Sequence, residues 1–329
     1  MRMGILGSAT TKIQDLLRIS RLNNGATSFE KAVRWIKNYR LPGGGIPPHH
    51  KHKIATQEVT GYLICTLFRA GEKDLALDLA RWEASVQKSD GAFTAIDGVP
   101  YTFDTAQVIR GFLAVLDELP EVEANLRRAC DYVDRQIGPD GRVHTPSYDM
   151  WKVSGGRVFS EYTDLYVLPP MLQAGKKLSE PRYMAAAERG MNYFRQKPDL
   201  VEFKPNMSTL SHIFGYMMEA LVELGETDLA RKGLRHAAAM QREDGAIAAY
   251  PGVDWVCSTG MAQLAIAWYK LGDSAPANKA VAYLEKIQNS SGGFYGGYGD
   301  GAEYFPKEEI SWAVKFFIDS LLLRDGGIH

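Results

Sequence analysis

The seven residues QKSDGAF, at positions 87–93, are the clearest copy of a turn that this chain uses repeatedly. A glutamine ends a helical stretch, a glycine follows four residues later, and an apolar residue comes two positions after the glycine. QREDGAI at 241–247 and QNSSGGF at 288–294 keep this spacing, and QIGPDGRV at 136–143 is one residue longer. A fifth copy, YRLPGGGI at 39–46, lacks the glutamine. Such repetition is typical of a chain built from stacked supersecondary units.

The glycines of these turns give the number of units. They stand at positions 43, 91, 141, 245 and 292, which are about 50 residues apart except for one interval of about 104 residues. We place one unit without the motif in that interval, around residues 195–204. The sequence therefore predicts six units.

Two kinds of helix alternate between the turns. Residues 74–87 and 277–288, which precede turns, carry apolar side chains at spacings of three and four, as an amphipathic helix does. The stretches that follow the turns are more apolar, and we expect helices over 56–70, 104–116, 208–224, 258–271 and 308–323. A helix that is apolar nearly all round is buried on both sides. Each unit is therefore expected to pair an outer amphipathic helix with an inner buried helix.

The residues at the helix ends agree with these boundaries. Three polar residues fit helix N-caps: Asp104, Ser208 and Ser258. Three glycines that follow apolar runs fit helix ends: Gly71, Gly225 and Gly272.

One hairpin cannot bury its inner helix alone, so neighbouring hairpins must stack. Six hairpins closed into a ring bury every inner helix. We therefore predict an all-α (α/α)6 toroid, a single domain over residues 1–329 with residues 1–28 as an N-terminal extension. An open helical solenoid is the alternative. A closed ring would gather the polar residues of its loops and inner-helix N-termini around one shared cavity.

Composition excludes several classes of protein. The net charge of −1 gives no global attraction to nucleic acid. Three cysteines far apart form no disulfide framework or zinc pattern, and no signal peptide or membrane span is evident, so a cytoplasmic protein is expected. The basic run at 49–53 fits a solvated loop better than a phosphate or metal site.

The repeated turns resemble the QW motifs of squalene and hopene cyclases, and Asp104-Thr105-Ala106 resembles the end of their acid motif. The chain is similar to the terpenoid-cyclase and protein-prenyltransferase toroid superfamily, whose architecture six-hairpin glycosidases and polysaccharide lyases share. At the acid motif, however, Thr102 and Phe103 replace the preceding acids, and the last repeat has no histidine for a zinc site apart from His329. Both departures weaken the terpene and prenyl interpretations.

Three blocks resemble prenyltransferase-like, VpsJ-type polysaccharide biosynthesis proteins: FDTAQV at 103–108, DWVCSTGMAQLAIAW at 254–268 and YGDGAEYFPKEEISWAVK at 298–315. This resemblance implies an association with exopolysaccharide or cell-surface glycans. It also implies polysaccharide-assembly proteins as partners.

Polar residues at the expected rim of the cavity are the candidates for chemistry. Four are catalytic candidates: Asp104, Glu309, Asp164 and His212. Two carboxylates facing each other would act as acid and base on a glycosidic bond, whereas a tyrosine–histidine pair would favour proton abstraction, as in a lyase or epimerase. Each candidate also has a structural interpretation: the acids as N-cap groups, and His212 as a hydrogen-bonded core residue.

Aromatic faces and amides suit sugar binding, although such aromatics are equally common in cores. The substrate-binding candidates are Tyr101, Tyr148, Trp151, Tyr162, Asp254, Trp255, Tyr295, Tyr298, Tyr304 and Gln263. The glycine-rich stretch at 292–301 would allow close approach to a ligand, or is simply a turn.

Three functions follow from these observations. The first is a carbohydrate-active hydrolase, lyase or epimerase that acts on a glycan or a lipid-linked sugar. The second is an isoprenoid enzyme or lipid binder, and the third is a non-catalytic scaffold in polysaccharide biosynthesis. No nucleotide or metal signature is present in the sequence, so no cofactor is expected.

Overall fold

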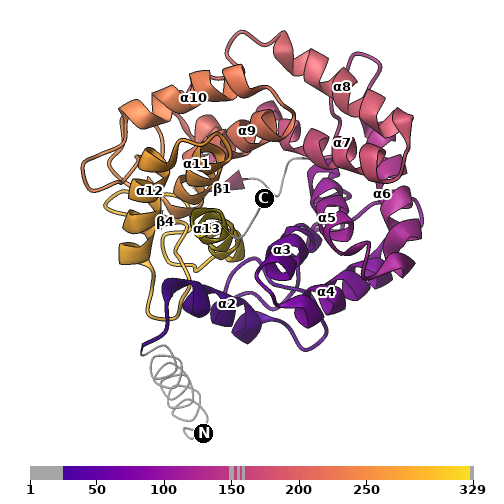
Figure 1. The fold of residues 1–329 in the computed structure, drawn as a ribbon, viewed down its shortest axis with the longest axis horizontal. Coiled ribbons are helices and arrows are strands. Elements are labelled where there is room, and N and C mark those ends of the chain that lie inside the picture. Colours follow the sequence, from indigo (N-terminus) through magenta and orange to yellow (C-terminus); the bar gives the residue numbers. More distant parts are fainter. Residues whose placement is uncertain (1–24, 148–151, 154–155, 158–159, 327–329) are drawn as a thin grey trace, which may run out of the picture.

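The described residues form a closed ring of helical hairpins. The computed structural model describes residues 25–147, 152–153, 156–157 and 160–326 (Figure 1). One layer of helices lines the middle of the ring and a second layer surrounds it. The predicted toroid is confirmed. The predicted N-terminal extension, residues 1–28, lies almost entirely outside the described residues.

The two layers alternate along the chain. The outer helices are α2 (Ser28–Tyr39), α4 (Lys73–Val86), α6 (Glu123–Gln136), α8 (Pro181–Arg195), α10 (Thr227–Ala239) and α12 (Ser274–Ile287). The inner helices are α3 (Gln57–Arg69), α5 (Thr102–Val115), α7 (Leu168–Lys177), α9 (Ser211–Glu223), α11 (Ser258–Lys270) and α13 (Ser311–Arg324). Each predicted helix forms with its ends shifted by a few residues, and the unit that lacks the motif is α8 with α9, which residues 195–204 connect. In the described part of the chain, no helix is both long and apolar enough to cross a membrane.

Short elements connect the hairpins. They are the 3-10 helices η1 (Pro120–Val122), η3 (Glu161–Val167) and η4 (Met207–Thr209), and the strands β1 (Lys152–Val153), β2 (Gly156–Arg157), β3 (Val256–Cys257) and β4 (Gly297–Tyr298). The strands form two antiparallel pairs, β1 with β2 and β3 with β4. The second pair joins the loop before α11 to the loop before α13.

The glutamine of the repeated turn links neighbouring units. Gln87 Nε2 donates to the carbonyl oxygen of Gly91 in its own turn, at 3.1 Å, and to that of Asn125 in α6, at 2.9 Å. Gln241 makes the equivalent bonds to Gly245, at 3.3 Å, and to Pro276 in α12, at 2.9 Å. One side chain therefore fixes each turn to the next outer helix.

The glycine of the turn is required by conformation and by space. Gly91 has φ of +95°, and a Cβ there would lie 2.1 Å from the carbonyl oxygen of Arg128 in the next outer helix. Left-handed φ favours glycine, and this close approach excludes any side chain. The sequence motif therefore marks the contact at which successive outer helices dock.

The same contact closes the ring. Gln288 Nε2 donates to the carbonyl oxygen of Ser28 in α2 at 3.0 Å, and a Cβ on Gly292 would lie 2.2 Å from the carbonyl oxygen of Lys31. Helix α13 packs against both α2 and α3. The last unit thus docks on the first as the others dock on one another, which excludes an open solenoid.

The N-cap predictions are wrong at all three positions. Helix α5 begins at Thr102 with Tyr101 as its N-cap, so Asp104 lies within the first turn, where its side chain faces the interior. Ser208 lies in η4, and Ser258 is the first residue of α11 rather than its cap. The glycine ends are confirmed: Gly71, Gly225 and Gly272 follow their helices with φ between +80° and +84°.

Candidate functional site

Two acidic residues lie side by side at the N-terminal ends of neighbouring inner helices. Glu58 is in the first turn of α3, and Asp104 is in the first turn of α5. The two helices meet closely because a Cβ on Gly61 would be 2.8 Å from Val108, and one on Gly111 would be 2.3 Å from the carbonyl oxygen of Gly61. Glycines one or two turns further along the helices therefore bring the two carboxyl groups together.

Burial changes the protonation of this acid pair, Glu58 and Asp104. Asp104 is only 3% exposed, and burial, followed by the charges of Glu58 and Asp97, raises its pKa well above the ordinary value. Burial raises the pKa of Glu58 to about 7. Glu58 as a residue is half-buried, whereas Asp104 is buried. The pair therefore retains a proton near neutral pH.

A second polar cluster lies on the neighbouring side of the ring. His212 on α9 has its Nδ1 2.6 Å from Oε1 of Gln263 on α11. Burial lowers the pKa of His212 to about 4, so the ring is neutral at pH 7 and Nδ1 donates to the amide oxygen. The ring centroid of Tyr304 lies 5.9 Å from that of His212, and the Tyr304 hydroxyl accepts a hydrogen bond from Trp312 Nε1 at 3.1 Å.

Electrostatics places the acid pair close to this cluster. After burial, the charge of Glu58 contributes to the raised pKa values of Tyr62, Tyr216 and Tyr304. Asp104 also contributes at Tyr62. The two carboxyl groups and these tyrosines therefore share one polar region at the N-terminal side of the inner helices.

A layer of aromatic rings fills the middle of the ring of helices. Phe103 on α5 contacts Tyr216 on α9 with centroids 5.1 Å apart, and Tyr216 contacts Phe316 on α13 at 5.7 Å. These are alternate inner helices, so their side chains meet across the centre. The expected single open cavity is therefore divided, because aromatic side chains from non-adjacent helices occupy its middle.

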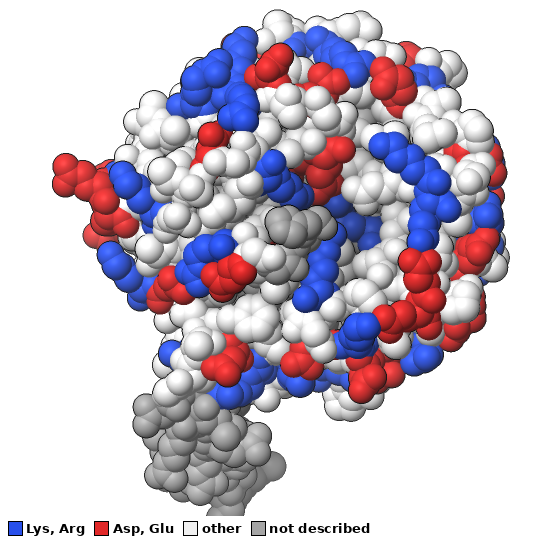
Figure 2. Space-filling view, viewed as in Figure 1, with Lys and Arg blue, Asp and Glu red and all other residues white. Residues whose placement is uncertain are grey.

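A cavity of about 200 Å³ lies on the other side of this aromatic layer. All six inner helices contribute to its wall, mostly through residues in their C-terminal halves such as Arg69, Glu223 and Lys270. Figure 2 shows this face of the molecule, hollowed at its centre with acidic and basic side chains around the hollow. The concavity is therefore at the end of the inner helices opposite to the one that the sequence indicated.

Glu309 lies at the closure of the ring. Its carboxylate accepts hydrogen bonds from Trp35 Nε1 at 2.7 Å, from Asn289 Nδ2 at 2.8 Å and from Ser291 Oγ at 2.6 Å. Tyr298 donates to Asn289 Oδ1 at 3.2 Å and accepts from the backbone N–H of Tyr295. These contacts engage Glu309, Tyr295 and Tyr298 in joining α2 to the last turn.

The other predicted site residues are scattered. Trp255 and Tyr101 are buried at 2% and 1% exposure, and the Asp254 side chain is fully exposed beside Arg242. Tyr162 donates to Asp199, and Asp164 is buried in η3 at 2% exposure. Tyr148 and Trp151 lie outside the described residues. Of the catalytic candidates, Asp104 and His212 lie beside the same polar region; their chemical roles stay predictions.

Two acidic residues near Asp104 are not among the four catalytic candidates: Glu58, which the sequence places only among the polar residues at the expected rim, and Glu83, which it does not indicate at all. Glu58 gains its importance only through the close contact of α3 with α5. Glu83 lies on the outer helix α4, yet it is fully buried, and neither of its oxygens has a partner among the described residues. Burial, then the charge of Asp104, raises the pKa of Glu83 well above its usual value. An acid at an inward position of an amphipathic helix is the signal that would have found it.

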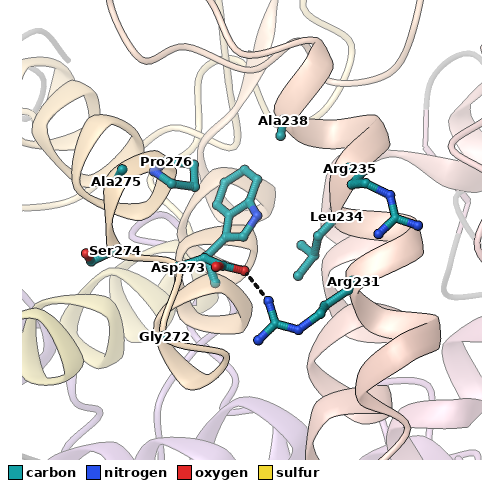
Figure 3. Close-up of a pocket in the computed structure, with 10 residues that line it drawn as sticks. Arg231, Leu234, Arg235, Ala238, Gly272, Asp273, Ser274, Ala275 and Pro276 are labelled. Carbon is teal, nitrogen blue, oxygen red and sulfur yellow. Dashed lines mark hydrogen bonds and ion pairs between the residues drawn. The ribbon is translucent and has the colours of Figure 1, made fainter.

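A groove of about 490 Å³ lies on the outside of the ring (Figure 3). It runs between α10 and the turn that joins α11 to α12. Arg231 crosses it to Asp273 at 2.8 Å and also donates to the carbonyl oxygen of Leu271 at 2.8 Å. These bonds connect two neighbouring units, and the groove is separate from the central site.

Comparisons with known proteins agree on the fold. No protein-family model matches the sequence, and no curated protein matches it. A glycosyl hydrolase family 88 protein from Bacteroides vulgatus aligns with a TM-score of 0.65 at 11% identity, over 96% of this chain and 99% of that one. A heparin-specific unsaturated glucuronyl hydrolase aligns at 0.66 and 11% identity, over 94% and 97%. An alpha-amylase from Clostridium perfringens aligns at 0.69 and 13% identity, over 90% and 98%.

These neighbours have the six-hairpin glycosidase-like architecture, and this chain has the same toroid fold. Their identities are too low to transfer an activity, and the activities themselves differ. The narrower resemblance to prenyltransferase-like, VpsJ-type polysaccharide biosynthesis proteins finds no support in these comparisons. The function of this chain must therefore be inferred from the geometry and electrostatics of its site.

Proposed function

We propose that this protein is a glycan-cleaving hydrolase in which Asp104 and Glu58 act as the acid and base. The observation that carries the proposal is the acid pair itself: two adjacent carboxyl groups with raised pKa values, one of them on a half-buried residue. Acidic groups of this kind cluster at functional sites, because burying them without cations is unfavourable for the fold. The glycosidase-like fold of the structural neighbours agrees with this choice of reaction.

The two carboxyl groups have different tasks in the proposed reaction. Asp104, which has the more strongly raised pKa, gives its proton to the glycosidic oxygen as the carbon–oxygen bond breaks. Glu58, whose pKa is about 7, takes a proton from the water that attacks the anomeric carbon. The products are two sugars, and the enzyme returns to its starting state when Asp104 regains a proton and Glu58 loses one to solvent.

The alternative of proton abstraction by a tyrosine is less favourable. Burial raises the pKa of Tyr304 well above its usual value, so the phenolate needed as a base is scarce at neutral pH. The neighbouring His212 is a weak base because burial lowers its pKa to about 4. We therefore place these residues beside the substrate rather than in the proton transfer.

The substrate class is part of the proposal. The substrate we propose is a glycan, and an exopolysaccharide, a cell-surface glycan and a lipid-linked oligosaccharide are the forms that the experiment compares. Tyr304, on which the charge of Glu58 acts, has an aromatic face of the kind that packs against a sugar ring.

The test is turnover of a panel of acidic and neutral oligosaccharides, including a lipid-linked one. Mass spectrometry would detect the hydrolysed products, and ultraviolet absorbance would detect an unsaturated one. We expect hydrolysis by the native protein and a loss in kcat of roughly hundred- to ten-thousand-fold in Asp104→Asn, as removal of a general acid causes. Asp117→Asn is the matched control, because the side chain of Asp117, just after the C-terminal end of α5, is 82% exposed.

Three results would overturn the proposal. Asp104→Asn with undiminished turnover would show that the acid pair is not catalytic. An unsaturated product would show a lyase. A folded protein that cleaves nothing across the panel would support a non-catalytic binding role.

A further inference from the structure

The cavity at the C-terminal side of the inner helices contains an ion-pair network that the proposed hydrolysis does not use. Glu223 Oε2 is 2.7 Å from Arg110 Nη1, and Glu223 Oε1 is 2.6 Å from Lys270 Nζ. Burial alone would raise the pKa of Glu223, but Arg110 and Lys270 hold it well below the ordinary value. Glu223 is therefore a permanent anion that fixes both cations in place.

Arg110 has an unused recognition edge. The residue lines the cavity, is 8% exposed, and holds its guanidinium 4.5 Å from the centroid of the Tyr166 ring. Only Nη1 bonds to Glu223, and neither Nε nor Nη2 has a hydrogen-bond partner in the part of the chain that the structure describes. Nε–H and Nη2–H point in parallel from one edge of the guanidinium, and this fork matches the two oxygens of a carboxylate.

The opposite wall offers acceptors. Glu219 Oε2 and Asp319 Oδ1 have no hydrogen-bond partner among the described residues, and both residues line the same cavity. Lys315 lies 2.9 Å from the other oxygen of Asp319 and keeps that carboxylate in position. Unpaired buried acceptors are costly, and hydroxyl groups on a ligand would satisfy them.

The charges on the cavity wall favour a hydroxy acid over an amino acid as the ligand. The wall carries four cations, Arg69, Arg110, Lys270 and Lys315, against three acidic residues, Glu223, Asp319 and Glu219, and burial raises the pKa of Glu219. Arg69 and Lys270 lie in the last turns of their helices, where they also offset the partial negative charge of the helix ends. An ammonium group beside Glu219 and Asp319 would be repelled by Lys270 and Lys315, whose charges already act on these acids, so neutral hydroxyl groups suit them better. A carboxylate, in contrast, has the Arg110 fork as its partner.

We propose that this cavity binds a small hydroxy carboxylate, with its carboxylate on the Nε–Nη2 edge of Arg110 and its hydroxyl groups toward Glu219 and Asp319. The volume of about 200 Å³ limits the ligand to a small molecule of roughly monosaccharide size. The proposal is independent of the reaction proposed for the acid pair, because it rests on Arg110, Glu219 and Asp319, which that reaction does not use.

The experiment compares two probes that differ only at the recognised group. D-gluconate and sorbitol have the same six-carbon polyol chain, but only gluconate carries a carboxylate. In wild-type protein we expect gluconate, and not sorbitol, to shift the Nε–H resonance of Arg110 in a nitrogen–proton correlation spectrum. Titration calorimetry should give an affinity for gluconate that is at least about tenfold weaker in Arg110→Lys, because lysine keeps the charge but loses the fork.

Matched variants locate the binding. Arg231→Lys changes an arginine that pairs with Asp273 on the outside of the ring, and it should leave gluconate affinity unchanged. Asp104→Asn should also leave it unchanged. Equal binding of gluconate and sorbitol, an unperturbed Arg110 resonance, or a loss of gluconate affinity in Asp104→Asn would each overturn the proposal. The resonance measurement uses wild-type protein, so it decides the question even where Arg110→Lys does not fold.

Discussion

The two sides of the inner ring bury the same kind of side chain with opposite results. At the N-terminal side, Asp104 and Glu58 are buried next to each other, and their pKa values rise. At the C-terminal side, Glu223 is similarly enclosed, but Arg110 and Lys270 contact it and its pKa falls. Burial alone therefore does not set the protonation state of a carboxyl group. The presence or absence of a cation within hydrogen-bond distance does.

This difference distinguishes a site whose carboxyl groups titrate near neutral pH from a site whose carboxylate stays ionised. A carboxyl group without a cation exchanges its proton near neutral pH, which suits acid–base chemistry. A carboxylate held by two cations keeps its charge and positions its partners, which suits recognition of a ligand. The first three experiments below test whether the two sides behave in these different ways, beginning with the largest expected effect.

Glu223→Ala should be the most destabilising of these substitutions. It leaves Arg110, which is 8% exposed, without its partner, and it also frees Lys270. Breaking a buried pair by removing one partner costs about 3–5 kcal/mol. Urea denaturation would measure the change in the free energy of unfolding.

The control for this prediction is another carboxylate in an ion pair. Asp117→Ala removes the partner of Lys177, but the Asp117 side chain is 82% exposed, so a change within about 0.5 kcal/mol is expected. If the two substitutions had equal effects, the contrast between the two sides of the ring would be lost.

The architecture could be predicted from the sequence because its signals are local. The turn glycines at positions 91, 141, 245 and 292 have positive φ and lie against the next outer helix. The turn glutamines at 87, 241 and 288 bond within four residues and to that same helix. Each copy of the motif therefore corresponds to one contact between successive outer helices. Its repetition counts the units, even though the unit of α8 and α9 lacks it.

The centre of the ring could not be predicted in the same way. Phe103 and Tyr216 meet from α5 and α9, which are 113 residues apart in sequence and are not adjacent in the ring. Their contact depends on how each helix is rotated about its own axis. When a helix is apolar on all faces, its hydrophobic pattern gives almost no information on that rotation. The same uncertainty affects Asp104: a helix that starts two residues early turns an expected N-cap into a buried acid.

Glu58→Gln tests the N-terminal side through the pH dependence of stability. The pKa of Glu58 is about 7 in the folded protein, against 4.5 for an unperturbed glutamate. Between these values the unfolded chain releases its proton while the folded protein keeps it, so the native protein loses stability as pH rises. Glu58→Gln removes this loss. The free energy of unfolding of the variant, relative to that of the native protein, should therefore rise by about 1–3 kcal/mol between pH 4 and pH 8, a range that allows for the partial solvent exposure of Glu58.

The measurement is the difference between the two proteins at each pH, because His212 acts in the opposite sense. Its pKa is lowered from 6.5 to about 4, so the unfolded chain binds the extra proton and stability falls as pH drops through that range. This contribution is present in both proteins and cancels in the difference. Glu121→Gln, at a side chain that is 59% exposed, should give a flat difference; an equally flat curve for Glu58→Gln would show that Glu58 is an ordinary solvated carboxylate.

Glu83→Met should give the smallest effect, and in the stabilising direction. Glu83 is fully buried, with neither carboxyl oxygen hydrogen-bonded within the described ranges. Methionine has a similar length and no polar group to desolvate, so a gain of about 1 kcal/mol is expected at neutral pH. Glu188→Met, at a side chain that is 62% exposed, is the control, and it should change stability by less than about 0.5 kcal/mol.

Glu83→Gln separates the two causes of this gain. Glutamine removes the titration but keeps a buried polar group, so it should abolish the pH dependence that Glu83 contributes while stabilising the protein less than methionine does. Because burial and the charge of Asp104 raise the pKa of Glu83, the advantage of Glu83→Met should be larger at pH 8 than at pH 4. Destabilisation by both substitutions would mean that the Glu83 carboxyl group makes a favourable interaction, and the N-terminal side would then resemble the C-terminal side more closely than its lack of cations implies.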